Sequence, residues 1–286
     1  MEILLFAVLN GLCWGLVLFL LAAGLSIVFG LMDIVNLAHG LMYMTGAYAG
    51  LTIANVTGNY WLGLLVAIVA SGLLGLIIER GFLRTLYREQ LAQILVCFGL
   101  IYIIVNIHLW IYGPYPKTIH ELPAILANYF LIGDFQFTYY RLAVIIFGFL
   151  LFGFLFWAQQ RTKVGAIVRA GMNDPEHVRA LGINLMKVNI GAFVLGSVLS
   201  GLGGYIGLPV IGAVVPTTAE GVLFLGISII IVGGVGSVQG TLAGALLIGV
   251  GNSIIRCYLP DMAVFFIPCV LLLTLIFKPY GMFQQK

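Results

Sequence analysis

The chain has 286 residues, of which 62% are hydrophobic and only 8% are charged, and its formal net charge at pH 7 is +3. A mean hydropathy of +1.14 excludes a soluble globular domain, because such a fold has to cover itself with polar and charged surface. The composition predicts an integral membrane protein. Its basic residues are not pooled on one water-facing surface, so no nucleic-acid partner is expected.

Uninterrupted apolar runs are long enough to cross a hydrocarbon core, which needs about 20 helical residues. These runs cover residues 3–29, 61–78, 91–111, 142–158, 188–212, 221–236, 241–255 and 262–277, with a further candidate at 37–56. None shows the alternation of apolar and polar residues that is typical of a membrane-spanning strand. We therefore expect an all-α, polytopic bundle of eight or nine transmembrane helices, surrounded by lipid and forming a single domain over residues 1–286.

The stretch GLMDIVNLAHG, residues 30–40, places Asp33, Asn36 and His39 between two apolar runs. An acid at the centre of a membrane helix costs about 2.5–3.5 kcal/mol, so these side chains should face protein or water. Two interpretations stay open: a cytoplasmic turn in which Asp33 or Asn36 caps the next helix, or a break that lines a path for a polar solute. A catalytic triad with Ser26 is not favoured, because no nucleophile elbow accompanies it.

The basic residues orient the chain, because loops rich in Lys and Arg stay in the cytoplasm. Such residues follow the 61–78 run and recur through a long loop at about 159–187, so both loops are expected to be cytoplasmic. The loop at about 113–140 then lies outside. It is rich in Pro, Tyr and Phe and poor in charge, which predicts a cap at the membrane interface.

Within the long cytoplasmic loop, DPEHVRAL predicts a helix of two or three turns. Asp174 can cap it, Pro175 suits its first position, Glu176 lies near the positive end of its dipole, and Gly182 ends it. The helix is either a solvated connector or a docking surface for a cytoplasmic partner.

Many of the 37 glycines gather in GSVLSGLGGYIG and in VGGVGSVQGTLAGALLIGVG. Spacings of four, as in Gly203–Gly207 and Gly236–Gly240, allow helices to pack backbone to backbone. Around Gly234 and Gly236 we expect a tight turn whose unwound backbone approaches the path. This turn lacks the lysine of a phosphate-binding loop, so no nucleotide is expected on this chain.

The spans offer little for a proton or sodium relay, since Asp33, His108 and Glu220 are expected near span ends. This counts against an ion-coupled secondary transporter or channel, which remains the alternative. The four cysteines have neither CxxC spacing nor a nearby His cluster, so no metal site is expected. No catalytic residue is expected either, although an intramembrane enzyme stays a third class.

Four segments in the same order resemble one family. NDPEHVRALGIN is similar to the cytoplasmic signature loop of ABC-importer permeases, with His177 and Val178 where that signature has two alanines. GLMDIVNLAHGLMYMTGAY, VGGVGSVQGTLAGALLIG and KPYGMF are similar to the branched-chain amino acid permeases.

The resemblance implies one subunit of a multi-component importer in a bacterial inner membrane. Its partners would be cytoplasmic ABC ATPase subunits that hold the ATP, a periplasmic solute-binding protein, and a second permease or a copy of itself. The resemblance assigns ATPase coupling to five residues of the long loop, Arg169, Asp174, Glu176, Ala180 and Gly182. The solute would be a branched-chain or other amino acid, or urea, an amide or an aromatic acid.

Overall fold

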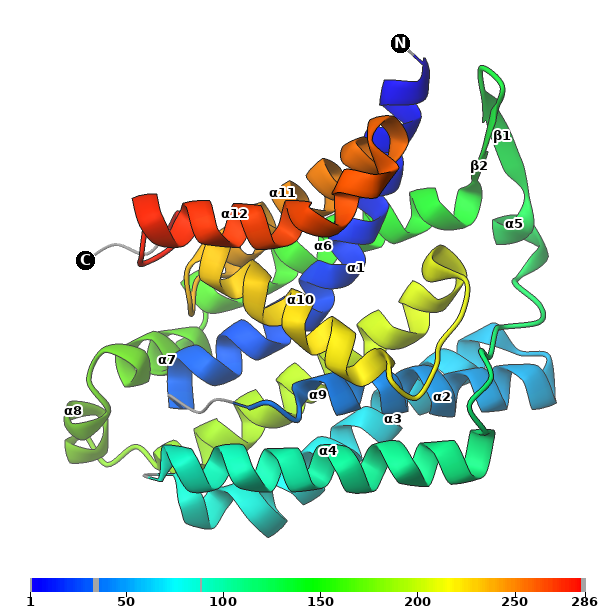
Figure 1. Ribbon diagram of the computed structural model, residues 1–286. Coiled ribbons are helices and arrows are strands. Elements are labelled where there is room, and N and C mark those ends of the chain that lie inside the picture. The colour runs from blue at the N-terminus through cyan, green and yellow to red at the C-terminus, as the bar shows by residue number, and fades with distance from the viewer. Residues whose placement is uncertain (1, 33–35, 88, 284–286) are drawn as a thin grey trace.

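The computed structural model describes residues 2–32, 36–87 and 89–283 and forms an all-α bundle (Figure 1). Its longer helices are α1 Glu2–Met32, α2 His39–Thr57, α3 Tyr60–Ile78, α4 Gln90–Tyr112, α6 Tyr139–Arg161, α9 Leu185–Ile211, α10 Thr218–Gly233, α11 Val238–Tyr258 and α12 Ala263–Phe277. Across the described ranges, seven helical segments are long and apolar enough to cross a membrane, and α10 is a shorter apolar helix. The predicted polytopic helical fold is confirmed.

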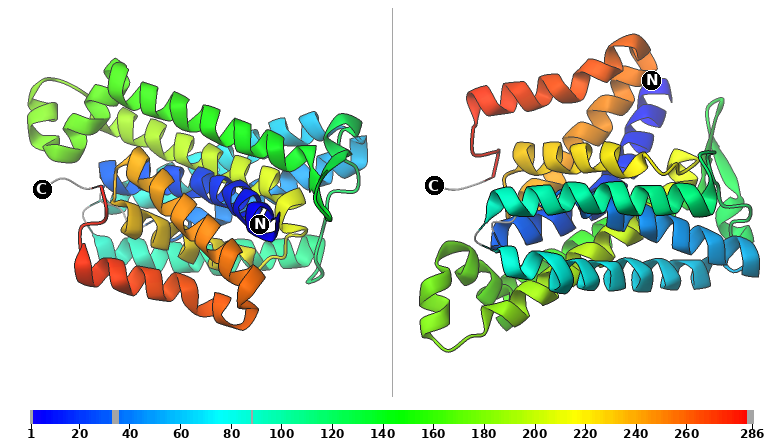
Figure 2. Two further views of the ribbon diagram at one scale, coloured as in Figure 1. Left: turned by 90° about the horizontal axis from the view of Figure 1, so that it is seen from above. Right: turned by 60° about the horizontal axis from the view of Figure 1, so that its bottom comes forward.

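Helix α1 is the central element of the bundle and packs against α9 and α11 (Figure 2). Of its most apolar window 78% is buried, against 6% for the segment that contains α12, which lies at the periphery. Small residues make the packing possible. A Cβ atom built at Gly24 would lie 2.4 Å from the carbonyl oxygen of Gly196, and one at Gly46 would lie 2.4 Å from the Cα atom of Gly201. Helices α1 and α2 therefore meet α9 backbone to backbone.

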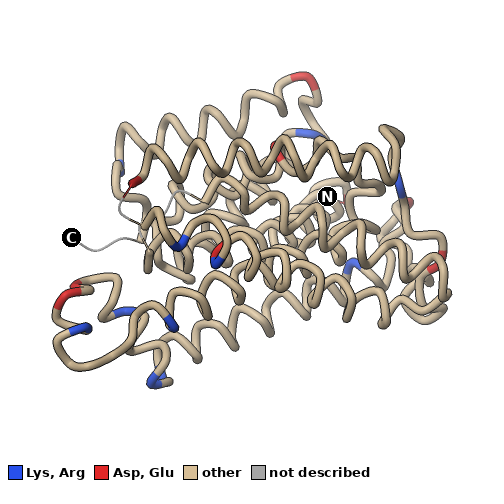
Figure 3. The backbone as a smooth tube through the Cα atoms, turned by 90° about the horizontal axis from the view of Figure 1, so that it is seen from below, with Lys and Arg blue, Asp and Glu red and all other residues tan. Residues whose placement is uncertain are grey.

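Two helices project from one end of the bundle, α7 Lys163–Asn173 and α8 Pro175–Ala180 (Figures 1 and 2). Several Lys and Arg residues lie at this end (Figure 3), so it is the end that the charge distribution assigns to the cytoplasm, and we call it the cytoplasmic end. The loop helix is slightly shorter than the two or three turns predicted, since α8 has six residues, but it ends where predicted, with Gly182 in a left-handed conformation (φ 79°) just beyond it. Helix α7, capped by Thr162, was not predicted. The chain after α3 adds two short helices at this end, η1 Glu79–Leu83 and η2 Arg84–Leu86.

The opposite end carries α5 Ala124–Ala127 and an antiparallel hairpin of β1 Tyr129–Ile132 and β2 Phe135–Thr138 (Figure 1). The Phe135 ring stacks on Phe6 at the start of α1, with ring centroids 4.7 Å apart. Lys117 pairs with Val214 beyond the end of α9. The 113–140 segment thus covers the outer ends of the helices, and α1 begins on the outer side. A short 3-10 helix, η3 Pro260–Met262, precedes α12.

Candidate functional site

Helices α2 and α10 begin in the middle of the bundle rather than at one of its ends (Figure 1). His39, the first residue of α2, places Nε2 3.2 Å from the carbonyl oxygen of Leu21, and Ser200 donates to the carbonyl oxygen of His39 at 3.3 Å. Leu21 lies eleven residues before the end of α1, or about 16 Å along its axis. The chain after α1 therefore turns back into the membrane before α2 begins.

The start of α10 lies against the start of α2. A Cβ atom built at Gly40 would lie 2.0 Å from the carbonyl oxygen of Ala219, in the first turn of α10. From there α10 runs to the cytoplasmic end, whereas α2 runs to the outer end. Segments α1–α2 and α9–α10 are thus inverted copies of one arrangement, a long helix followed by a helix that starts inside the membrane.

Buried polar atoms without partners gather at the start of α2. Both side-chain polar atoms of Asn36, Nδ1 of His39 and the hydroxyl of Tyr43 are enclosed and have no hydrogen-bond partner among the described residues. These three residues are 2%, 0% and 2% exposed. A buried polar group without a partner is costly, so such a group needs a function or a ligand to explain it. Asp33, predicted beside them, lies outside the described residues.

Tyr43 escaped the sequence interpretation, although it follows His39 by one helical turn and so shares its face. Its hydroxyl would lie 2.7 Å from a Cβ atom at Gly207, so that glycine makes room for it. Gly203 lies against α1 in the same seam, where a Cβ atom would be 3.1 Å from Cβ of Leu20. Ser26 does not join His39, because its hydroxyl accepts a hydrogen bond from the amide of Gly236.

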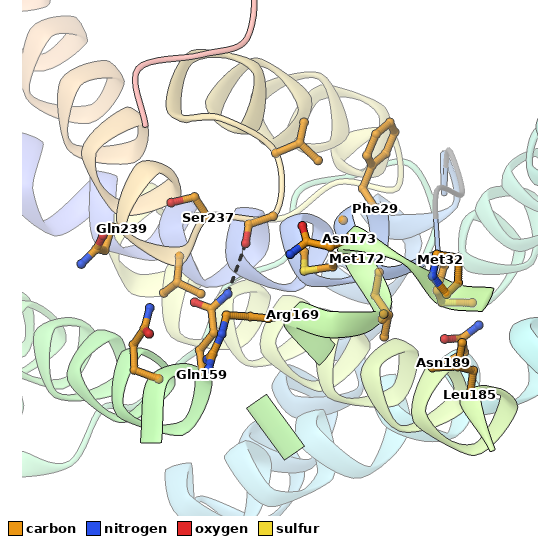
Figure 4. A pocket seen from close by; sticks show the side chains of 18 of the residues that line it. Phe29, Met32, Gln159, Arg169, Met172, Asn173, Leu185, Asn189, Ser237 and Gln239 are labelled. Carbon is orange, nitrogen blue, oxygen red and sulfur yellow. Dashed lines mark hydrogen bonds between the residues drawn. The ribbon is translucent and has the colours of Figure 1, made fainter. Parts of the chain in front are cut away.

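A cavity of about 830 Å³ opens at the cytoplasmic end (Figure 4). Its walls come from the last turn of α1, the end of α6, helices α7 and α8, the start of α9 and the turn between α10 and α11. The polar side chains that line it are Tyr87, Gln159, Gln160, Arg169, Asn173, Arg179, Asn189, Ser237 and Gln239. The described part of the lining contains two arginines and no acid. Nη1 of Arg169 is buried and has no hydrogen-bond partner among the residues that the structure describes.

The turn between α10 and α11 meets three other elements, α1, α6 and α7, at Gly236. The amide of Gly236 donates to Oγ of Ser26 on α1 at 3.0 Å, and its carbonyl accepts from Nε2 of Gln159 on α6 at 3.2 Å (Figure 4). The terminal methyl group of Met172 on α7 lies where a Cβ atom at Gly236 or at Gly30 would stand, 2.5 and 2.0 Å away. Met172 therefore fills the space between α1 and the α10–α11 turn, which is open because Gly30 and Gly236 have no side chains.

Glycine geometry explains the shape of this turn. Gly234 and Gly236 have φ angles of 102° and 78°, conformations that L side chains rarely adopt. A Cβ atom at Gly240 would lie 2.1 Å from the carbonyl oxygen of Gly233, so α10 and α11 touch directly beside it. Ser237 caps α11 by accepting from the amide of Gly240 at 3.1 Å.

Helix α8 begins as the sequence predicts. Oδ1 of Asp174 accepts hydrogen bonds from the amides of Glu176 and His177 at 3.1 and 3.0 Å. The bond from the His177 amide holds the pKa of the Asp174 carboxyl below its ordinary value. Val178 alone of this helix is buried, whereas Glu176 and Ala180 are exposed.

The five predicted coupling residues are divided between two places. Glu176, Ala180 and Gly182 are exposed on or just after α8, with Asp174 at its start, while Arg169 faces the cavity behind it (Figure 4).

The three ionisable residues expected near span ends are not together. Nδ1 of His108 on α4 donates to the carbonyl oxygen of Ile104 at 2.9 Å, near the outer end. Glu220 lies at an end of its helix, in the first turn of α10, but that helix starts inside the bundle, next to the Gly40–Ala219 contact, which was not predicted. Among the described residues no group of three His, Cys, Asp or Glu side chains could hold a metal ion.

Residues 7–275 match the family described as branched-chain amino acid transport system, permease component. The probable branched-chain amino acid transport permease protein LivH of Methanocaldococcus jannaschii is 27% identical, over 92% of this chain and 87% of its own. The high-affinity branched-chain amino acid transport system permease proteins BraD of Pseudomonas aeruginosa and LivH of Escherichia coli are 26% and 25% identical, each over 95% of this chain and over 93% and 92% of their own. No solved structure matches the chain.

Proposed function

This chain belongs to the permease components of branched-chain amino acid transport systems, and from that premise we propose that it works in an ATP-driven importer of the bacterial inner membrane. It is a multi-pass membrane permease subunit. Its solutes are branched-chain amino acids or related small polar solutes, as the names of its relatives suggest. The ion-coupled alternative is not favoured, because those relatives belong to transport systems of several components.

The ATPase docks on α8. This helix is short, projects from the cytoplasmic end and has a single buried anchor, Val178, so most of its surface is available to a partner. Ala180 and Gly182 have small side chains or none, which leaves a flat surface there, and Leu181 between them is 78% exposed. An apolar side chain of that exposure beside small residues is typical of a contact surface. ATP binds to that partner and not to this chain.

The Met172 contact carries the proposal that docking moves the transmembrane helices. Helix α7 lies between α8 and the bundle, and Met172 inserts between Gly30 of α1 and Gly236 of the α10–α11 turn. A displacement of α8 and α7 therefore reaches α1 and α10 through direct packing. Because both helices lead to the enclosed polar atoms of Asn36 and His39, the same displacement opens or closes the path there.

Delivery and assembly complete the proposal. The outer cap formed by residues 113–140 receives the periplasmic solute-binding protein, and a second permease, related or identical, covers part of the apolar surface of the bundle. Large apolar side chains remain exposed along α4, α6 and α12, and lipid covers the rest of them.

The test is binding-protein-dependent uptake in proteoliposomes that contain the permeases and the ATPase, with labelled branched-chain amino acids, other amino acids, urea and aromatic acids. Ala180→Arg places a long cation on the docking face without straining the backbone and should abolish stimulated ATP hydrolysis. Thr85→Arg places the same cation on the other cytoplasmic segment, at an exposed site, and should leave hydrolysis unchanged. Equal stimulation in Ala180→Arg would refute docking on α8, and uptake of every solute without ATP would refute the ATP-driven importer.

A further inference from the structure

Glu220 is an acid exposed on the surface of the chain, in the first turn of the apolar helix α10. It stands thirteen residues before Gly233 at the cytoplasmic end of α10, which is about 20 Å along the helix axis. The hydrocarbon core is about 30 Å thick, so this carboxylate lies well inside it. Its neighbour Ala219 is buried against Gly40, whereas Glu220 and Gly221 are exposed.

A charged side chain at this depth does not face lipid. An acid near the centre of a membrane helix is costly, so such residues face a partner or a water-filled path. A structural explanation exists in part, because an acid in the first turn of a helix interacts favourably with the dipole. The same interaction with the dipole would stabilise an acid at a helix start that faces water. It therefore does not explain why this acid lies on a helix that begins inside the membrane.

The surroundings supply the complementary chemistry. The first turns of α2 and α10 meet here, and both present the positive ends of their dipoles, which favour a carboxylate. The side-chain amide of Asn36 is enclosed without a partner among the described residues, just before the start of α2, and its N–H groups can donate to a carboxylate. Nδ1 of His39, whose Nε2 donates to the carbonyl of Leu21, can only accept a hydrogen bond. Glu220, in the first turn of α10, supplies a negative charge that is complementary to an ammonium group on the same solute. An α-amino acid carries its carboxylate and its ammonium group on the same carbon atom, so one solute can satisfy both halves of the site.

We propose that the Glu220 carboxylate faces the translocation path and binds the ammonium group of the transported amino acid. This proposal rests on the proposed function and adds a requirement for a cation on the solute. It selects α-amino acids over urea, amides and carboxylic acids that lack an amine.

Accessibility tests the placement without assuming a ligand. In the assembled complex with its native cysteines replaced, Glu220→Cys should react with a membrane-impermeant, anionic thiosulfonate reagent. Ile103→Cys is the matched control, because Ile103 is 59% exposed near the middle of the apolar helix α4 and should stay unreactive. An unreactive Glu220→Cys, before and after ATP is added, overturns the proposal.

Specificity tests the chemistry. Glu220→Gln should lower the rate of leucine import relative to 4-methylpentanoate, which keeps the carboxylate and lacks the amine, at least about tenfold, the equivalent of about 1.4 kcal/mol. Glu220→Asp should restore part of the leucine rate, which a purely structural role would not predict. An unchanged ratio in Glu220→Gln overturns the ammonium site while the importer stands. If the wild-type complex imports no labelled solute, the proposed function itself has failed.

Discussion

Replacing Asp174 by Ala should weaken the association between this permease and its ATPase by about fivefold. The Asp174 carboxylate accepts two amide hydrogen bonds at the start of α8, and losing such a cap costs about 0.5–2 kcal/mol, typically about 1. Helix α8 has six residues and helices of this length are marginal on their own, so the cap decides how often the helix forms. A change of about 1 kcal/mol alters the helical population about fivefold.

The apparent affinity of a partner falls with the fraction of its target that is competent to bind. Titrating the ATPase against the permease in nanodiscs, with ATP hydrolysis as the readout, should therefore give a half-saturating concentration about five times higher and the same plateau. Asp174→Asn keeps the capping oxygen and should behave like the wild type, while Glu121→Ala, on the outer loop, controls for removal of an acid. The reasoning is refuted if Asp174→Ala titrates like the wild type, and a shift in Asp174→Asn equal to that of Asp174→Ala would assign the effect to charge.

Three further outcomes are expected. Gly236→Ala should lower import in proteoliposomes more than it lowers ATPase binding, because a left-handed φ costs a non-glycine residue about 1–2 kcal/mol and the new Cβ atom would meet Met172. Adding Met172→Ala should recover part of the import. If the effects of the two substitutions simply add, the two residues are not in contact. Asn36→Leu should raise the thermal unfolding temperature in detergent, because it removes a buried amide that has no partner in the described part of the chain, and it should abolish uptake. A lower temperature would mean that the amide has a structural partner. The pKa of the Asp174 carboxyl is lower in the folded protein than in the unfolded chain, so its cap is fully present above the ordinary carboxyl pKa and is lost as the pH falls through the lower folded value. The ATPase concentration that half-saturates the permease should therefore stay constant between about pH 5 and pH 7.5. A change centred in that range would mean that another group controls docking.

The features that the sequence predicts correctly depend on neighbours in the chain. Each membrane helix matches an apolar run, because burial in lipid needs only length and composition. The start of α8 follows from Asp174 and Pro175, and its end from Gly182, because caps are interactions between residues a few positions apart. The hairpin at Tyr129–Thr138 had a local signal that went unused, the Gly133–Asp134 pair between two aromatic stretches.

The features that could not be predicted from the sequence depend on contacts between segments that are far apart in the chain. The depth of Glu220 was not predicted, because an apolar run does not tell at what depth a helix starts. That depth is set by Ala219 meeting Gly40, a contact across 179 residues of chain. The insertion of Met172 between Gly30 and Gly236 is of the same kind, since each glycine by itself indicates only a turn or close packing.

The packing around Gly236 explains why a short cytoplasmic element can move long membrane helices. A flexible methionine in a loose surface contact would absorb a displacement of α7. Met172 instead fills a seam without side chains, and the same turn is tied to α1 through Ser26 and to α6 through Gln159. Because packed interiors have low compressibility and transmit strain, a shift of α7 cannot be absorbed at this point and must displace α1, α6 or the α10–α11 turn. Two of those elements lead directly to the helix starts at which Asn36 and Glu220 stand, so the proposed docking on α8 and the proposed path are linked by continuous packing.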